Sequence, residues 1–285
     1  MTGGAALLSW YGPRRRAYPW RGAGDPYRIL VSEIMLQQTQ AARVDPVYRS
    51  FLRRFPSIRA LARASSGDVL RAWSGLGYNR RAAALHEAAR VVVREHGGRV
   101  PADPEMLRRL PGVGPYTAAA VASIAFDVPA AAVDTNVARV VRRYRLGQDA
   151  ATPGEVRRAA QGWLDRRAPG DWNQAVMDLG RDVCRPVPRC TACPLARSCV
   201  FRRSGALPEP SRRRRPGFEG SSRQLRGAIV RILRDRGSAT VATLWQATRR
   251  RREEVVGSIR VLAAEGLIRA GPAARRGEAR GVVRL

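Results

Sequence analysis

The sequence contains no lysine, so all 52 of its basic side chains are arginines. Without an ε-amine, a Schiff base with a carbonyl substrate can form only on the N-terminal amine, and imine chemistry on a lysine is excluded. Acidic side chains are also few: 23 against 52 basic ones leave a formal net charge of +29. A field of that size favours a polyanionic partner, with nucleic acid first, although GC-rich coding also enriches arginine.

The sequence also lacks long hydrophobic runs, and it has no cysteine outside one short segment. No stretch approaches the length of a membrane span, and residues 1–12 lack the basic region that opens a signal peptide. We therefore expect a cytoplasmic protein without a membrane partner. The four cysteines all fall between positions 184 and 199. In a reducing compartment, such clustering favours a metal site over a disulfide framework.

What is present is mostly helical patterning. From about residue 5 to 200, apolar residues recur at helical spacing between Gly and Pro breaks, which predicts an array of short helices. Residues 201–222 are rich in Arg, Pro, Gly and Ser and are predicted to be a basic linker. Residues 223–285 predict three helices and two short strands, the order of a winged helix. Such a domain either contacts DNA or serves in docking and packing.

A turn with little side chain lies within LPGVGPYTAAAV, residues 110–121. Gly112 and Gly114 allow backbone N–H groups to approach a ligand closely, and Pro115 suits the first position of the next helix. The start of that helix adds positive dipole, so the turn suits a phosphate oxygen. A plain connection between two helices is the alternative.

Two carboxylates stand out from their surroundings. Glu33 lies in an otherwise apolar helical stretch, where burial is costly unless the carboxyl has a partner or lines a cavity. Burial would also raise its pKa toward that of a general acid at neutral pH. Asp134 follows an apolar run and precedes a helix, so by itself it predicts an N-cap. The polar run 37–40 suits either base edges or a solvated helix end.

The cysteines have the spacing of a metal site, with gaps of five, two and five residues: Cys184, Cys190, Cys193 and Cys199. Four thiolates are accepted both by Zn²⁺ and by a [4Fe–4S] cluster, so the residues alone leave both open.

Together these motifs resemble the helix-hairpin-helix DNA glycosylases, and within them the MutY family of adenine DNA glycosylases. The resemblance covers roughly residues 7–200. The motifs that carry it are PWR at 19–21, PY at 26–27, SEIMLQQTQ at 32–40, GLGY at 75–78, LPGVGPYTAAA at 110–120, VDTNV at 133–137, MDLG at 177–180 and the cysteine cluster.

The resemblance implies a mainly α protein. Residues 1–200 would form the helix-hairpin-helix catalytic domain, in two helical subdomains with a [4Fe–4S] cluster loop, followed by the linker 201–222 and the winged-helix-like domain 223–285. It also implies an enzyme of base excision repair that flips an adenine, mispaired with guanine or 8-oxoguanine, out of double-stranded DNA. Such a protein would act as a monomer at a bacterial nucleoid.

The resemblance assigns roles residue by residue. Glu33 would protonate the adenine and activate water, and Asp134 would stabilise the oxocarbenium-like sugar. The other assignments are Tyr116 and Asn136 beside the sugar, Trp20 and Arg21 in the base pocket, Gln38 and Tyr78 inserted into the base stack, Gly112, Val113 and Gly114 on a DNA phosphate, and the four cysteines on the cluster. Relatives that nick the strand carry lysine where this chain has Tyr116, so we expect a monofunctional glycosylase.

The chain departs from the MutY pattern in two places. The first cysteine gap is five residues where the superfamily usually has six, which leaves zinc as an alternative to iron–sulfur. Residues 223–285 are too short for the Nudix-like domain that inspects oxidised guanine, and SSRQLRGAIVRIL resembles instead the short C-terminal region of actinobacterial members. The resemblance to the MutY family therefore implies recognition of 8-oxoguanine less directly than it implies excision of adenine.

Two other functions compete with adenine excision. A mismatch glycosylase removing thymine or uracil opposite guanine shares the tyrosine and both carboxylates, but LQQTQ and GLGY favour adenine. A non-catalytic DNA-binding protein with a metal cluster is the alternative from another class. Such a binder would have no chemical need for Glu33 and Asp134, so the acid pair favours an enzyme.

Overall fold

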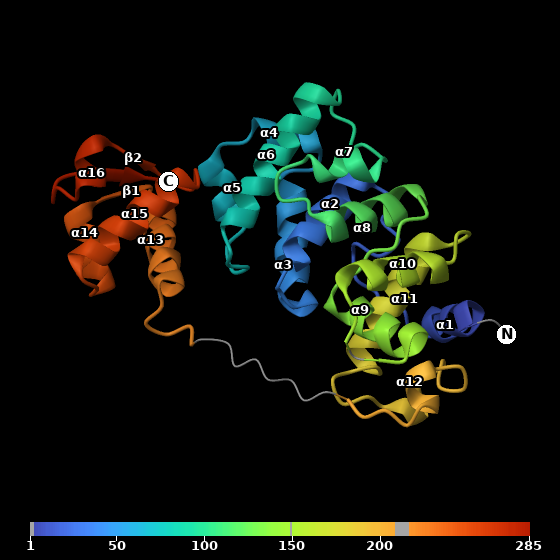
Figure 1. Cartoon of the computed structure of the whole chain (residues 1–285). Coiled ribbons are helices and arrows are strands. Elements are labelled where there is room, and N and C mark those ends of the chain that lie inside the picture. Colours follow the sequence, from blue (N-terminus) through green and yellow to red (C-terminus); the bar gives the residue numbers. More distant parts are fainter. Residues whose placement is uncertain (1–2, 149, 209–216) are drawn as a thin grey trace. The chain divides into compact units, whose positions relative to one another are not determined.

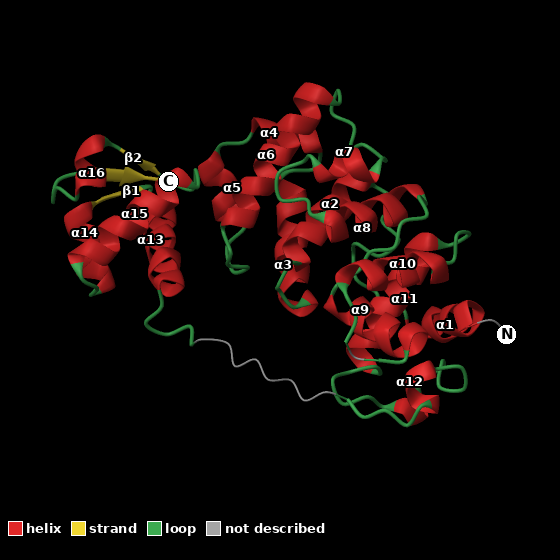
Figure 2. Cartoon of the chain, viewed as in Figure 1, coloured by secondary structure: helices red, strands yellow, loops and turns green. Residues whose placement is uncertain are grey.

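The computed structural model describes residues 3–148, 150–208 and 217–285, and within them helices predominate (Figure 1, Figure 2). The chain divides into two compact units. Unit 1 comprises Met1–Ile34 and Val100–Arg213, and unit 2 comprises Met35–Arg99 and Arg214–Leu285. The predicted mainly α fold is confirmed, and the described strands all lie near the C-terminus.

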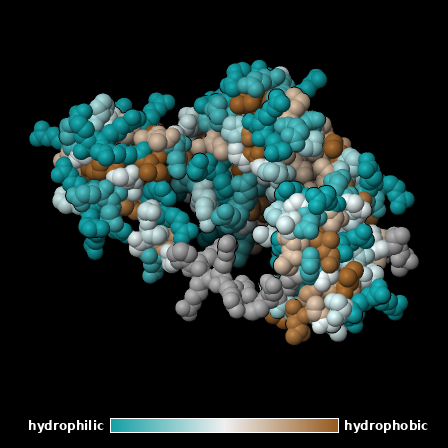
Figure 3. Space-filling model, viewed as in Figure 1, coloured by the Kyte–Doolittle hydropathy of each residue, from teal (hydrophilic) through white to brown (hydrophobic). Residues whose placement is uncertain are grey.

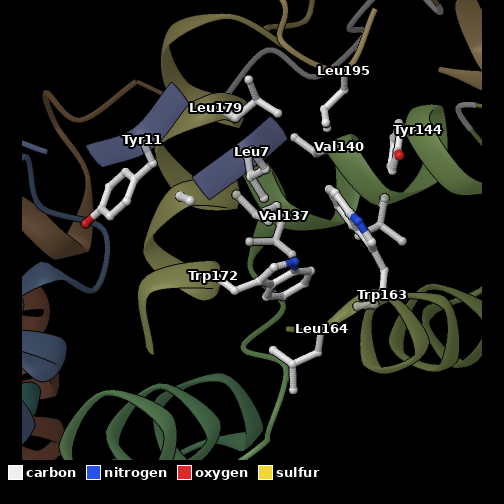
Figure 4. Packing of buried hydrophobic residues seen from close by; sticks show 14 of the residues in the cluster. Leu7, Tyr11, Val137, Val140, Tyr144, Trp163, Leu164, Trp172, Leu179 and Leu195 are labelled. Carbon is white, nitrogen blue, oxygen red and sulfur yellow. The ribbon is translucent and has the colours of Figure 1, made fainter. Parts of the chain in front are cut away.

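Unit 1 is an array of helices joined by short turns. Its elements are α1 (Gly3–Tyr11), η1 (Gly12–Arg14), most of α2 (Pro26–Leu36), α7 (Pro104–Arg108), α8 (Pro115–Phe126), α9 (Thr135–Val141), the π-helical η2 (Arg142–Leu146), α10 (Pro153–Trp163), α11 (Pro169–Asp182), η3 (Cys190–Ala192) and α12 (Val200–Arg203). Figure 4 shows its hydrophobic core, in which α1, α9, α10 and α11 contribute aromatic and branched side chains. Trp163 lies edge-on to Trp172, with ring centroids 5.2 Å apart. This packing fixes α9 and α11, two helices that carry polar residues of the site.

Local capping explains where several of these helices begin. A capping box joins Thr152 and Glu155 at the start of α10, with Pro153 at the first helical position. Asp134 caps α9 as predicted, accepting a hydrogen bond from the Val137 N–H. By contrast, α8 begins after Gly114 without a side-chain cap, which leaves its first turn without that acceptor.

Unit 2 begins with a second helical segment. It contains α3 (Ala41–Arg54), α4 (Ile58–Arg63), α5 (Ser66–Ala72) and α6 (Arg80–Glu95). Phe51 packs edge-on against Phe55 and Trp73, with centroid distances of 4.9 and 6.1 Å. The segment therefore has an apolar core of its own.

Residues 217–285, here called the C-terminal domain, lie in unit 2 and contain helices and strands. Its elements are α13 (Ser222–Arg236), β1 (Ser238–Thr240), α14 (Val241–Thr248), α15 (Arg252–Ala264), β2 (Arg269–Ala270), α16 (Pro272–Arg276) and β3 (Val282–Arg284). The strands form an antiparallel sheet in the order β1-β3-β2. Sequence reasoning missed β1 and α16, because three and five residues are too few to show periodicity.

The segment predicted as a basic linker contains helical residues at both of its ends. Its first residues belong to α12, and α13 already begins at Ser222, whereas its arginine run lies outside the described residues. Hydrophilic residues cover much of the face in Figure 3. None of the described helices is long and apolar enough to span a membrane.

Candidate active site

The turn between α7 and α8 has the form of a helix-hairpin-helix. Gly112 adopts a φ of +78°, which favours glycine, and the Val113 N–H closes the turn on the Leu110 carbonyl at 3.1 Å. Val113 is buried beneath the turn, whereas Gly112 and Gly114 are exposed. Val113 therefore anchors the turn in the protein interior, while the backbone at both glycines is accessible to a ligand.

Glu33 occupies the last part of α2 and is 7% exposed. Its carboxyl accepts a hydrogen bond from the hydroxyl of Tyr116, which lies one residue into α8 and also contacts the Met177 sulfur at 3.4 Å. The pKa of Glu33 is raised to about 7, chiefly by desolvation. The Tyr116 hydrogen bond and the Arg21 charge oppose this rise, and the charge of Asp134 adds to it. The group is thus protonated over much of the range in which a general acid works.

Asp134 faces the same centre from the start of α9. Its Oδ1 accepts the Val137 N–H at 2.7 Å, and its Oδ2 accepts the Asn136 side-chain amide at 3.2 Å. Desolvation raises the pKa of Asp134, while these hydrogen bonds stabilise the ionised form. The N-cap role is compatible with a role in a site, because the cap holds the carboxylate in place.

Arg139 supports this arrangement from one turn further along α9. Its guanidinium donates to Asn136 Oδ1 at 2.9 Å, to the Gly180 carbonyl at 2.6 Å and to the Cys184 carbonyl at 2.7 Å. A methyl group on Gly180 would lie 2.8 Å from the Cβ of Asn136. Contacts from α11 and the cysteine loop therefore fix the amide that holds Asp134.

Arg21 and Asp178 form a bidentate ion pair, with both N–O distances 2.7 Å and side chains 9% and 4% exposed. Arg181 adds a second contact to Asp178 at 2.9 Å. Trp20 is buried and stacks on Tyr18, with centroids 4.8 Å apart. The pairing fixes the segment 18–21 against α11. Arg21 is then close enough to Glu33 for its positive charge to lower the pKa of that carboxyl.

Gln38 and Tyr78 belong to unit 2 and share an unusual backbone conformation. Both adopt positive φ, +55° and +47°, which side chains other than glycine enter at a cost. Arg81, at the start of α6, donates to the Met35 carbonyl at 2.8 Å and to that of Gln37, and also to the Gly77 carbonyl at 3.3 Å. One guanidinium therefore holds both turns that present the two predicted intercalating side chains, and Tyr78 is 49% exposed.

The four cysteines line one pocket and none of them forms a disulfide. Arg143, which is buried, donates to the carbonyls of Arg185 and Pro186 at 2.7 and 3.0 Å, and the Arg189 N–H bonds to the Val183 carbonyl at 2.9 Å. These contacts order the shortened first gap of the cluster motif. No group of three His, Cys, Asp or Glu side chains in the described ranges is placed to hold a single metal ion. The donor set of four thiols around a common pocket fits an iron–sulfur cluster.

Comparison with known proteins decides the family. Residues 31–166 match the HhH-GPD superfamily of base excision DNA repair proteins. A Mycobacterium tuberculosis protein named adenine DNA glycosylase is 46% identical over 235 residues, which cover 80% of this chain and 77% of that protein. Its namesake from Mycolicibacterium smegmatis is 41% identical over 272 residues, 92% of this chain and 91% of that protein. The chain belongs to the adenine DNA glycosylase family.

This membership confirms the predicted resemblance and shows that the protein is a DNA glycosylase of base excision repair. The M. smegmatis relative matches so much of the chain that the relationship extends into the C-terminal domain. A thermostable thymine-DNA glycosylase of known structure superposes with a TM-score of 0.66 and 32% identity, covering 70% of this chain and 95% of that one. The helix-hairpin-helix fold is therefore common to glycosylases named for different bases.

Sequence reasoning assigned no role to several residues that organise the candidate site. Asp178 lies within MDLG, and a carboxylate on the core-facing side of an amphipathic helix was a signal that it has a buried partner. Arg139, Gly180 and Arg81 gave no such signal, because arginine is abundant here and a helical glycine is common.

Proposed function

We propose that this glycosylase removes adenine mispaired with guanine or 8-oxoguanine and leaves an abasic site. The observation that carries the proposal is the convergence of Glu33, whose pKa is raised to about 7, with Asp134 and Tyr116. Two carboxyl groups with different environments are what hydrolysis of a glycosidic bond requires, since one must give a proton while the other stays ionised.

The reaction begins with an adenine flipped out of the stack. The protonated Glu33 gives its proton to a ring nitrogen of the adenine, and the bond from that base to C1′ breaks with its electron pair leaving on the base. Positive charge then develops on the sugar, where the Asp134 carboxylate stabilises it. Water adds to C1′, and the Glu33 carboxylate takes the proton that the water loses.

Residues around the carboxyl pair have supporting roles. Burial raises the pKa of Tyr116 well above its usual value, so the phenol stays neutral and remains a hydrogen-bond donor to Glu33. We assign Trp20 and Arg21 to the wall of the base pocket, and Gln38 and Tyr78 to the base stack. The hairpin Gly112, Val113 and Gly114 would bind a backbone phosphate and orient the duplex, with one protein monomer on each lesion.

We place a [4Fe–4S] cluster on the four cysteines. Such a cluster would hold together the loop 184–199 of unit 1, where the Cys184 carbonyl already accepts a hydrogen bond from Arg139. Iron and acid-labile sulfide analysis, together with visible absorption of the purified protein, tests this assignment. A colourless protein that carries zinc contradicts it.

A single-turnover assay tests the activity, using duplexes that carry A, T or U opposite guanine or 8-oxoguanine. Alkali-dependent cleavage only at adenine is expected, and borohydride should trap no complex linked through a lysine, because the chain has none. The fold shared with a thymine-DNA glycosylase makes thymine the second candidate substrate. Release of thymine or uracil, with adenine left intact, would refute adenine excision.

Glu33→Gln serves as the matched control for chemistry. The variant keeps the size of the side chain and should bind the mismatched duplex as tightly as the native protein while losing excision. Excision at the native rate would contradict the assignment of Glu33 as the acid.

A further inference from the structure

The sheet of the C-terminal domain places two arginines directly opposite each other. In the register of β2 and β3, Arg269 pairs with Arg284, and Ser238 of β1 pairs with Arg284 from the other side. The neighbouring row of Ala239, Val283 and Ala270 is buried against the helices. Because side chains alternate between the two faces of a strand, both arginines point to the solvent face.

This arrangement is unfavourable in the protein by itself. Like charges directly opposite each other across an antiparallel pair destabilise a sheet. Neither Arg269 nor Arg284 forms an ion pair or a side-chain hydrogen bond with any residue in the described ranges. Other arginines of the same domain do have acidic partners, namely Arg234, Arg250 and Arg276. The two positive charges on the sheet therefore lack a counter-charge among the residues that the structure describes.

The helix that a winged helix usually directs at DNA is less suited to an anion here. α15 begins with Glu253 and Glu254 in its first turn. Its basic side chains are used internally, because Arg252 donates to the Gly277 carbonyl at 2.6 Å and Arg260 to the Arg275 carbonyl at 2.7 Å. Glu254 in that first turn pairs with Arg250 at 2.8 Å, so this arginine is occupied as well. The sheet, whose two arginines have no such partner among the described residues, is therefore the better candidate for a DNA contact.

We propose that the solvent face of this sheet, centred on Arg269 and Arg284, binds backbone phosphates of the DNA duplex. Fifteen arginines against six acidic side chains in residues 217–285 give the domain the charge that such a partner requires. Guanidinium groups on phosphates read no bases, so the contact is independent of sequence. The inference rests on the proposed function only in taking DNA as the substrate.

The test compares the full-length native protein with the double variant Arg269→Gln/Arg284→Gln. Fluorescence anisotropy with a matched and a mismatched duplex should show affinity lowered roughly tenfold or more near 0.1 M salt, equally for both duplexes. The slope of log affinity against log salt should become shallower by about two, one for each lost phosphate contact. The melting temperature should stay equal or rise, since a repulsive pair is removed.

A second double variant, Arg223→Gln/Arg231→Gln, controls for net charge. Both arginines are exposed on α13, and the charge change is identical. This control should lower affinity less and leave the salt slope closer to the native value. An equal loss in both variants would overturn the proposal in favour of a diffuse field. An unchanged affinity in the sheet variant would also overturn it, and would leave the arginines to an acidic protein partner.

The excision rate at saturating protein separates this proposal from the proposed function. The sheet variant should excise at the native single-turnover rate once bound, because its arginines do not touch the reacting groups. A lower DNA affinity of the sheet variant supports the sheet contact, whichever base the native protein excises. Failure of the native protein to excise adenine bears only on the proposed function.

Discussion

The Tyr116 hydroxyl donates a hydrogen bond to the Glu33 carboxyl, and burial raises the pKa of both groups. Their shifts have different consequences because the ordinary values differ. The phenol remains neutral at every physiological pH, whereas Glu33 changes its charge near pH 7. The pair therefore provides a permanent donor beside a carboxyl that titrates in the working range, which links stability and activity to the same proton.

The first prediction concerns stability against pH. The unfolded Glu33 carboxyl ionises near 4.5 and the folded one near 7, so stability is retained below 4.5 and lost as pH rises toward 7. A shift of this size corresponds to about 3 kcal/mol at most. Glu33→Gln should remove the loss, so its melting temperature should exceed the native one at pH 8 and approach it at pH 4. A difference in melting temperature between Glu33→Gln and the native protein that stays constant from pH 4 to pH 8 would contradict a buried, titrating Glu33.

The second prediction concerns the rate of excision. Because Glu33 must be protonated to act as an acid, the single-turnover rate at saturating protein should fall as pH rises through about 7. Rates measured on a mismatched duplex between pH 5.5 and 9 give the profile. A rate that increases through pH 7 would assign the essential proton to another group.

The third prediction uses the close approach of α11 to Asn136. In Gly180→Ala the new methyl group meets the Asn136 backbone and Cβ, so the helices must separate or the amide must move away from Asp134. Excision should fall at least tenfold, with a stability loss of about 1–3 kcal/mol. Gly162→Ala in α10 is the control, because nothing lies within 4 Å of its new methyl group. Equal activity in the two variants would refute the role of this contact.

The fourth prediction concerns the ion pair of Arg21 and Asp178. Asp178→Asn leaves a buried guanidinium without its carboxylate, and should lower the free energy of unfolding by about 3 kcal/mol. Asp182→Asn removes a more exposed pair and should cost less than about 1 kcal/mol. Urea denaturation measures both. A cost at Asp178 no larger than that at Asp182 would show that the buried pair is not required for stability.

The fifth prediction concerns Arg81. Arg81→Gln removes the bonds to the turns of Gln37 and Gly77, so Gln38 and Tyr78 should lose their fixed conformations. Fluorescence of 2-aminopurine next to the target adenine should then show less base flipping, and excision should slow. Arg90→Gln on the same helix loses only an exposed pair with Glu87 and should behave as native. Base flipping at the native level in Arg81→Gln would show that Arg81 is not needed to position these turns.

The amino-acid sequence by itself determined the local features of this protein. Helices and their ends follow from apolar periodicity, from caps such as Asp134 and from glycine turns such as Gly112. The missing lysine excluded a lysine imine, and the cysteine spacing indicated a metal site. Each of these properties depends on residues close together in the chain, or on residue types alone, and so can be read without coordinates.

Tertiary structure alone decided which distant groups meet. Arg21 and Asp178 pair across 157 positions, and the raised pKa of Glu33 follows from its burial in the folded protein and from the nearby charge of Asp134. Likewise, only the register of the sheet sets Arg269 opposite Arg284. Periodicity shows which face of an element is buried but not what packs against it, because that depends on how helices and strands fit together in space.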